Sequence, residues 1–416
     1  MLVVYEVVIM IMILIEFNYF KTYFSPFSIM GCCYAIAPIL INIIGKNIGM
    51  YTLKDYNLLY TMIFLIIFWI PGIILSQCTK KKRLYNNNRI KYICSRVDVY
   101  RLKLLTLFIV CILFFLITVI TVLRTYGFAG SKNHTDGVAA HFGYLALMLA
   151  PYIVYYAVNQ KKYLYFVLIG LLFFELIMLQ NKLPIVILLL QSIYFIFMIK
   201  GRARGKKIIK IGLIVVLIVM LLFIGLYSIQ PWLILKNASM QDSLNYGFER
   251  FIHYFFSGFI SSNEYYMDPA GNTFQDGWKV AFGFINTLKE FIFGKGDYVS
   301  PVIEKWVLIA PGSATNVGGM FSELVYQIGF LWAGVYVLGI GFMVYFIFYL
   351  SARYQIFVNT SAYLMAMTSV SFFCNFYALF STFEKLIYVI ILDLIIWKVR
   401  ARKIKISFLY NSKCRE

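Results

Sequence analysis

The chain has 416 residues, of which 62% are hydrophobic and 13% charged, and its formal net charge is +20. Hydrophobic runs of this extent cannot all lie in the cores of soluble domains, so the composition excludes a soluble multidomain protein and indicates a membrane protein. A strongly basic soluble protein would suggest nucleic-acid binding. Here the basic residues follow membrane topology instead, and we expect no nucleic-acid partner.

About eleven stretches are long and apolar enough to be membrane spans, which predicts an all-α polytopic membrane protein with about 10–12 transmembrane helices. We interpret residues 1–416 as a single transmembrane domain. The first stretch has no positive leader and no small-residue cleavage site, so we expect a span there rather than a signal peptide. The spans are predicted near residues 3–19, 27–44, 58–75, 104–123, 142–158, 164–179, 184–199, 211–229, 317–349, 356–376 and 386–397.

The charges between the spans predict their orientation. Basic residues gather at 77–103, 200–210 and 398–416, which the positive-inside rule places in the cytoplasm. Alternation then places one long polar segment, 231–316, outside the cytoplasm, with six basic and eight acidic residues. None of the seven cysteines lies in this segment, as is typical of a loop that faces an oxidising compartment.

Several polar residues before the long segment are candidates for function. Arg124 ends a span at the outer surface, where a guanidinium suits phosphate or carboxylate, although snorkelling to the interface is the commoner role. His134 and Asp136 follow in a glycine-rich loop, but two ligands are too few to predict a metal site. We interpret His141 as a helix-end residue. Lys182 lies in an outer turn where the topology rule calls for no cation.

Carboxylates within apolar runs are functional candidates, because lipid disfavours them unless they are paired. Glu175 is the clearest case, and Glu6 and Asp393 lie nearer to span ends. Beyond the long segment, we expect Asn316 to cap a helix that begins at 317. Glu323 would then lie at the outer surface and face the loop, since this run exceeds the roughly 20 residues that a span needs.

Residues 244–262 of the long segment read LNYGFERFIHYFFSGFISS. Glu249, Arg250 and His253 share one helical face, and phenylalanines recur nearby at a spacing of four, which predicts an amphipathic helix on the membrane surface. In the functional interpretation, Glu249 orients the imidazole of His253 beside an Arg250 that binds an anion. The commoner alternative is an ordinary polar face of a surface helix.

The sequence holds no Walker-type phosphate loop, no HExxH motif and no Asp-x-Asp pair. We therefore expect neither a metal nor another cofactor. The energy for a reaction would have to come from the substrate itself or from a gradient.

The topology and one run of residues resemble the O-antigen and capsular polysaccharide repeat-unit polymerases. The Arg250–Tyr254–Gly258 stretch also looks like the loop of that family. One departure is Lys182, which lacks the neighbouring arginine of the basic turn that relatives carry. The residues of the resembling run are Thr315, Asn316, Val317, Glu323, Leu324, Tyr326, Gly329 and Gly334.

This resemblance implies glycosyl transfer on the outer face of the bacterial cytoplasmic membrane, with the long segment periplasmic or extracellular. The donor would be a growing glycan on undecaprenyl diphosphate, and the acceptor would be the terminal sugar of a second lipid-linked repeat unit. The implied partners, besides these lipid-linked oligosaccharides, are membrane lipids, a chain-length regulator and a flippase.

The reaction needs a base for the acceptor proton and cations for the departing diphosphate. His253 is the first choice of base, with Glu249 orienting it and Glu323 as the substitute. Aromatic residues could stack on sugar faces, although membrane-interface belts explain such residues equally well. The expected diphosphate ligands are Arg250, Arg124 and Lys182, and the expected sugar contacts are Tyr254, Tyr265, Tyr266 and Trp278.

Three alternatives stay open at this point. An O-antigen ligase would share the topology and the chemistry and differ in its acceptor. A polysaccharide flippase or transporter would favour short loops and inverted repeats, which the sequence does not show. A receptor or structural membrane component would tolerate substitution of Arg250 and His253.

Overall fold

The computed structural model describes residues 1–77, 97–131, 138–160, 162–200, 220–229, 239–269, 277–294 and 305–413, with isolated positions between 210 and 218. His134 and Asp136 lie outside the described residues. The predicted basic segments 77–103 and 200–210 also lie largely outside them, whereas the segment 398–416 is helical as far as Lys413.

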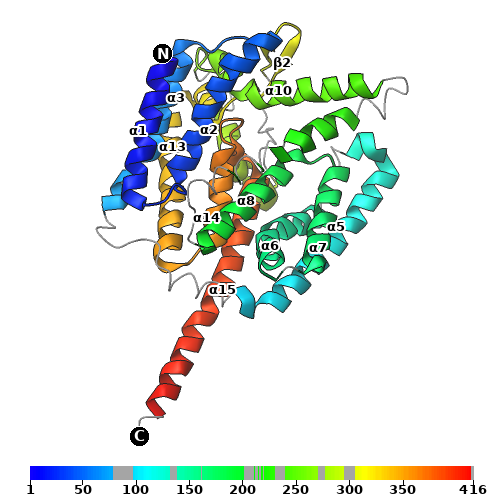
Figure 1. Cartoon of the computed structure of the whole chain (residues 1–416), viewed down its shortest axis with the longest axis vertical. Coiled ribbons are helices and arrows are strands. Elements are labelled where there is room, and N and C mark those ends of the chain that lie inside the picture. The colour runs from blue at the N-terminus through cyan, green and yellow to red at the C-terminus, as the bar shows by residue number, and fades with distance from the viewer. Residues whose placement is uncertain are drawn as a thin grey trace. The chain divides into compact units, whose positions relative to one another are not determined.

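The described chain is almost entirely helical (Figure 1). Its elements are α1 (Leu2–Phe20), α2 (Pro26–Leu40), η1 (Ile41–Gly45), η2 (Lys46–Ile48), α3 (Asp55–Gln77), α5 (Arg101–Gly130), α6 (Val138–Gln160), α7 (Tyr163–Met178), α8 (Lys182–Lys200), α10 (Met240–Tyr265), α11 (Gly277–Ala281), α12 (Gly283–Phe293), β1 (Val307–Ala310), β2 (Ser313–Thr315), α13 (Met320–Tyr354), α14 (Val358–Ser369), η4 (Phe376–Ala378) and α15 (Phe380–Lys413).

Seven helices of the described part are long and apolar enough to cross a membrane. Two shorter apolar helices cover Tyr163–Met178 and Met220–Ile229. The chain is thus an all-α membrane protein, as its sequence predicts. The number of eleven spans stays a prediction.

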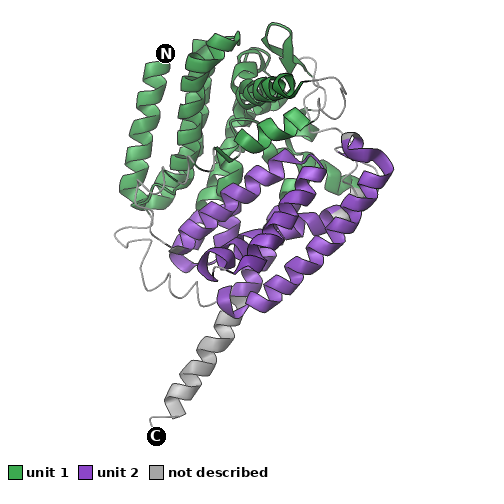
Figure 2. Cartoon of the chain, turned by 45° about the vertical axis from the view of Figure 1, so that its right-hand side comes forward, with its two compact units in different colours: residues 1–83, 203–346, 364–383 green, residues 84–202, 347–363, 384–416 purple. Residues whose placement is uncertain are grey.

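The chain folds as two compact units, each assembled from segments far apart in the sequence (Figure 2). Unit 1 comprises residues 1–83, 203–346 and 364–383, and unit 2 comprises residues 84–202, 347–363 and 384–416.

In unit 1 a buried carboxylate joins three helices. Glu16 of α1 accepts hydrogen bonds from the backbone N–H of Phe27 in α2 at 3.1 Å and from the hydroxyl of Tyr345 in α13 at 3.0 Å. A carboxylate that is removed from water needs such donors, because an unpaired buried charge is strongly unfavourable. The arrangement fixes the two N-terminal helices against α13.

Unit 1 also contains a small antiparallel hairpin that the sequence analysis does not predict. In β1 and β2, Val307 lies opposite Thr315 and Leu308 lies opposite Ala314. Pro311 and Gly312 form the turn, and the φ of +72° at Gly312 is a left-handed conformation that suits the third position of a type II turn. The strands are short, so pattern alone gives little signal for them.

Two helix boundaries differ from the expectation. Helix α13 begins at Met320 rather than at 317, so Asn316 does not cap it. The predicted run 356–376 is helical only as far as Ser369. Hydroxyls in its second half hydrogen-bond to nearby carbonyls, such as Ser371 Oγ to the carbonyl of Thr368 at 2.7 Å, and these local bonds compete with continued helix.

In unit 2, Asp393 of α15 binds the N-terminus of α14. Its carboxylate accepts hydrogen bonds from the backbone N–H and the hydroxyl of Thr360, both at 2.8 Å, and from the hydroxyl of Tyr152 at 3.0 Å. The first N–H groups of a helix lack partners within the helix, and a carboxylate satisfies them well. Asp393 therefore has a structural role.

Candidate functional site

The helix predicted for residues 244–262 is present as α10. Ser239 begins it, because its hydroxyl accepts a hydrogen bond from the backbone N–H of Asp242 at 3.1 Å. The N-terminal half is largely exposed, whereas most residues from Ile252 to Tyr265 are buried within unit 1. The prediction of a helix that lies along the membrane surface is therefore wrong for the second half, which is part of a protein core.

The buried half of α10 is anchored to the start of α3. The side-chain amide of Asn57 donates to the carbonyl of Phe259 at 2.8 Å and to the side chain of Asn263 at 2.9 Å. The hydroxyl of Tyr56 donates to the carbonyl of Asn263 at 2.8 Å. These bonds fix the direction in which the exposed half of α10 projects.

His253 lies at the border between the two halves and is half-buried. Its Nδ1 lies 3.1 Å from the hydroxyl of Ser313 on β2. Burial lowers the pKa of His253 below its usual 6.5, the charge of Glu249 raises it and that of Arg250 lowers it again. The imidazole is consequently neutral at pH 7 and able to accept a proton. Glu249 is exposed and acts on His253 through its charge, since Ser313 takes the Nδ1 contact.

Arg250 is exposed on the same half of α10. Its guanidinium carbon lies 5.1 Å from the ring centroid of Tyr246, one turn earlier. Stacking on an aromatic face limits the positions of a long side chain without using its N–H donors. The stacking on Tyr246 thus orients Arg250 without engaging its N–H donors.

The aromatic sugar contacts proposed from the sequence lie in different environments. Tyr265 and Tyr266 are 0% and 3% exposed, and their hydroxyls bind the carbonyl of Lys305 and the hydroxyl of Thr61. These two tyrosines are core residues, so the prediction that they stack on sugars is wrong.

Two of the predicted aromatic contacts remain partly exposed. The ring centroid of Tyr254 lies 4.5 Å from that of Phe373. Trp278 is also exposed, and its ring stacks on Phe282 with centroids 5.7 Å apart. One side of each ring is therefore occupied by the protein.

Glu323 is buried and does not face the loop, contrary to the expectation. Its two carboxylate oxygens accept hydrogen bonds from the backbone N–H groups of Gly318 at 2.9 Å and Asn375 at 2.7 Å. The thiol of Cys374 lies 3.6 Å away and donates as well. A carboxylate with this many donors holds two backbone segments together, and we assign it no proton-transfer role.

The residues that lead into α13 are hydrogen-bonded to two other segments of unit 1. The N–H of Gly319 donates to the carbonyl of Gly258 in α10 at 2.9 Å, and the N–H of Met320 donates to the carbonyl of Ser371 at 2.8 Å. Gly258 is needed for this approach, because a Cβ there would lie 2.7 Å from the carbonyl oxygens of Phe372 and Phe373. The run that carries the family resemblance is therefore a structural junction.

A small pocket lies at this junction, with a volume of about 10 Å³, room for about one water molecule. Hydroxyl groups line part of it: Ser262 Oγ lies 2.7 Å from Ser322 Oγ, and Thr61 Oγ1 lies 3.2 Å from the hydroxyl of Tyr266. Ligand pockets usually measure about 300–1,000 Å³, so we assign no substrate to this space.

The other two predicted cations, Arg124 and Lys182, belong to unit 2. Arg124 is exposed near the end of α5, and Lys182 is half-buried at the start of α8. The segments beside them are tied together, because the side-chain amide of Gln180 donates to the carbonyl of Phe128 at 2.6 Å. The hydroxyl of Ser131 also donates to the carbonyl of Met178 at 2.9 Å.

Glu175 of α7 is fully buried, and neither carboxylate oxygen has a hydrogen-bond partner within the described part of the chain. Its environment supplies no partner that would define a chemical role. The functional interpretation of Glu175 stays a hypothesis.

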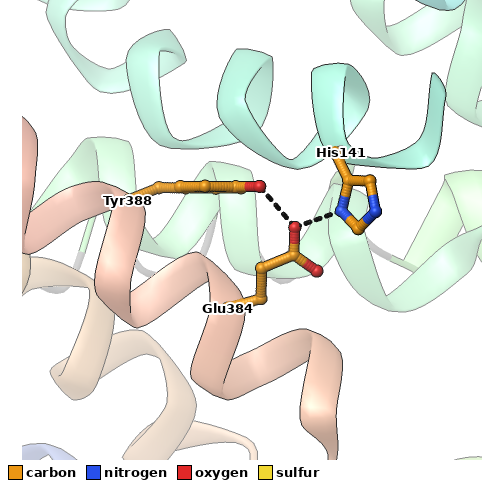
Figure 3. A network of polar contacts seen from close by, with 3 residues as sticks. All are labelled: His141, Glu384 and Tyr388. Carbon is orange, nitrogen blue, oxygen red and sulfur yellow. Dashed lines mark hydrogen bonds and ion pairs between the residues drawn. The ribbon is translucent and has the colours of Figure 1, made fainter. Parts of the chain in front are cut away.

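Sequence reasoning missed one polar cluster in unit 2 (Figure 3). Nδ1 of His141, in the first turn of α6, contacts Oε1 of Glu384 in α15, and the hydroxyl of Tyr388 donates to the same oxygen at 2.5 Å. His141 and Glu384 are 243 positions apart, so spacing could not connect them. The adjacent charges Glu384 and Lys385 in an apolar run were the signal available.

Within the described residues, no group of three or more histidine, cysteine, aspartate or glutamate side chains is suited to hold a metal ion. Comparison with curated proteins and with solved structures gave no match. A family model described as a family of unknown function, DUF6337, matches residues 50–406. Because this match covers most of the 416 residues, the chain belongs to the DUF6337 family.

Proposed function

We propose that this protein polymerises undecaprenyl-diphosphate-linked oligosaccharide repeat units into O-antigen or capsular polysaccharide. The reaction is a glycosyl transfer on the outer face of the bacterial cytoplasmic membrane. The proposal rests on the resemblance of the run from Thr315 to Gly334 and on the polar half of α10.

One observation carries most weight for the chemistry. Arg250 is exposed, oriented over Tyr246, and lies one turn from a half-buried His253. A guanidinium suits a diphosphate, which it can contact through two oxygens at once. A cation at this position stabilises the negative charge that develops as the lipid diphosphate leaves.

The donor supplies the energy of the reaction. The acceptor hydroxyl attacks the anomeric carbon, the bond between that carbon and the diphosphate oxygen breaks, and lipid diphosphate leaves with the electron pair. The protein has to hold two lipid-linked substrates, neutralise the diphosphate and accept one proton. His253 is one candidate for the proton acceptor, because its imidazole is neutral at pH 7.

The test is the glycan chain length on gels from cells in which the chain is deleted, restored, or restored as Arg250→Ala. We expect deletion to leave a single attached repeat unit, and Arg250→Ala to shorten the polymer strongly at an unchanged membrane level. Lys289→Ala is the matched control, since Lys289 is an exposed cation of the same 231–316 segment that the proposal does not use.

Other outcomes point to other functions. Long glycan that persists on its lipid carrier in the deletion strain would indicate a ligase. Single lipid-linked repeat units on the inner leaflet would indicate a flippase. Unchanged glycan in the deletion strain would refute the proposal altogether.

A further inference from the structure

The cluster of His141, Glu384 and Tyr388 in unit 2 has the geometry of a positioned base. The Nδ1 side of the imidazole faces the carboxylate, and Figure 3 shows the second ring nitrogen pointing away from it. Tyr388 donates to the same carboxylate oxygen from one turn further along α15. A carboxylate on Nδ1 fixes the orientation of the ring and leaves Nε2 as the proton acceptor.

The side chains of His141 and Glu384 differ in their exposure to solvent. The side chain of Glu384 is 10% exposed, whereas that of His141 is 50% exposed. A surface ion pair would expose both groups and contribute little. Here the carboxylate is shielded from water while the imidazole is accessible, which is the arrangement required for a reaction with an outside molecule.

A cation lies beside the pair. Lys385 Nζ is 4.3 Å from the ring centroid of Tyr144, which lies one turn after His141 in α6. Arg124 and Lys182, the diphosphate ligands expected from the sequence, belong to the same unit. Unit 2 therefore carries both an accessible imidazole and several cations that the topology places on the outer side.

We propose that His141 is the base that accepts the proton of the acceptor sugar hydroxyl, with Glu384 and Tyr388 as positioning residues. This inference rests on the glycosyl transfer proposed above and replaces His253 as the base. As the hydroxyl oxygen bonds to the anomeric carbon, its proton passes to Nε2 of His141. The bond from that carbon to the diphosphate breaks, and the electron pair leaves with lipid diphosphate.

The contrast with His253 supports this choice. A base has to stabilise the imidazolium that forms when it accepts the proton, and Glu384 provides a negative charge in direct contact with His141. At His253, burial disfavours the imidazolium most, the exposed Glu249 favours it through its charge alone, and Arg250 disfavours it again. The contact on Nδ1 is a neutral hydroxyl. His253 is able to accept a proton but holds it poorly.

The experiment uses the full-length protein purified in detergent. The probe is the pool of lipid-linked repeat units extracted from the deletion strain, and the measured quantity is the initial rate of polymer formation. The variants are His141→Ala, His253→Ala, Glu384→Gln and Tyr388→Phe. Before its rate is measured, each variant is shown to be folded: its elution profile and its midpoint of thermal unfolding must equal those of the protein without substitutions.

We expect His141→Ala to lower the rate by about 10²–10⁴-fold, the usual contribution of a positioned base. Added imidazole should restore part of the lost rate, because a small base can enter the space left by the ring. Glu384→Gln and Tyr388→Phe should cause smaller losses in that order, and the loss for His253→Ala should be smaller than that for His141→Ala.

Three results would overturn the assignment. They are an unchanged rate for His141→Ala, a loss that imidazole does not restore in a stable variant, or a greater restorable loss for His253→Ala. Failure of the proposed function has a different signature, since the deletion strain would then keep its full-length glycan and the unchanged protein would form no polymer.

Discussion

The carboxylate of Glu323 accepts a hydrogen bond from the backbone N–H of Asn375 at 2.7 Å, although the two residues are 52 positions apart. The same side chain accepts the N–H of Gly318, which precedes α13. One carboxylate therefore connects the residues just before α13 to the irregular stretch that follows α14. Each of these N–H groups would otherwise be buried without a partner.

Glu323→Gln should destabilise unit 1 without acting on the reaction itself. The amide keeps one acceptor oxygen but turns an NH₂ group toward a backbone donor, which costs about 1–3 kcal/mol for a buried group. The measurement is the midpoint of thermal unfolding in detergent, together with the rate per folded molecule. A stable variant with a large loss of rate would restore Glu323 as a candidate base.

Acid should destabilise the protein through His253. Burial lowers the folded-state pKa of this imidazole below 6.5, so the unfolded chain binds the proton more tightly. The free energy of unfolding therefore falls as the pH drops from 6.5, the pKa of His253 in the unfolded chain, toward the lower pKa of His253 in the folded protein. The thermal midpoint, measured from about pH 7.5 to 5.5, should fall less steeply in His253→Gln. Equal slopes would contradict the assigned burial.

Gly258→Ala should disrupt the contact between α10 and the Phe372–Phe373 backbone. The added Cβ would lie 2.7 Å from two carbonyl oxygens, and such overpacking costs about 1–3 kcal/mol. Gly170→Ala in α7 is the control, because no atom lies within 4 Å of its added Cβ. The control should be neutral or up to about 1 kcal/mol more stable, since alanine favours helix. Similar effects at both positions would refute the close approach.

Asp393→Asn should weaken the attachment of α14 in unit 2. The substitution removes the charge that accepts from Thr360 and Tyr152, and we expect a loss of about 1–3 kcal/mol. Asp55→Asn serves as the control, because that side chain is 83% exposed and its replacement should stay within about 0.5 kcal/mol. Thermal unfolding in detergent compares the two. A neutral Asp393→Asn would show that the network does not hold α14.

Residues that act within one helix could be predicted from the sequence, and residues that act across the chain could not. The spacing of Glu249, Arg250 and His253 predicted a helix that is present as α10, because helical periodicity is a local property. The contact of His253 with Ser313 depends on a hairpin whose strands have only four and three residues. No periodic pattern reveals strands that short.

The roles of the buried carboxylates also could not be predicted from the sequence, because these side chains contact residues far away in the chain. Asp393 was recognised as unusual because apolar runs disfavour charge, and Glu323 because it was expected at the outer surface, facing the loop. Their partners include backbone N–H groups, and the side-chain sequence carries no information about those. The pairing of His141 with Glu384 similarly requires that the beginnings of α6 and α15 meet, which depends on the packing of unit 2.

The break in α13 affects how this helix tolerates change in length. Gly329 has φ +77° and ψ 167°, a conformation that is essentially confined to glycine. The turns before it, which hold Glu323, are therefore not in helical phase with the turns after it. An inserted residue beyond the break would rotate the remainder of an intact helix by about 100°. An insertion between Gly329 and Tyr345 would therefore move Tyr345 away from Glu16, whereas Glu323 and its contacts lie before the break.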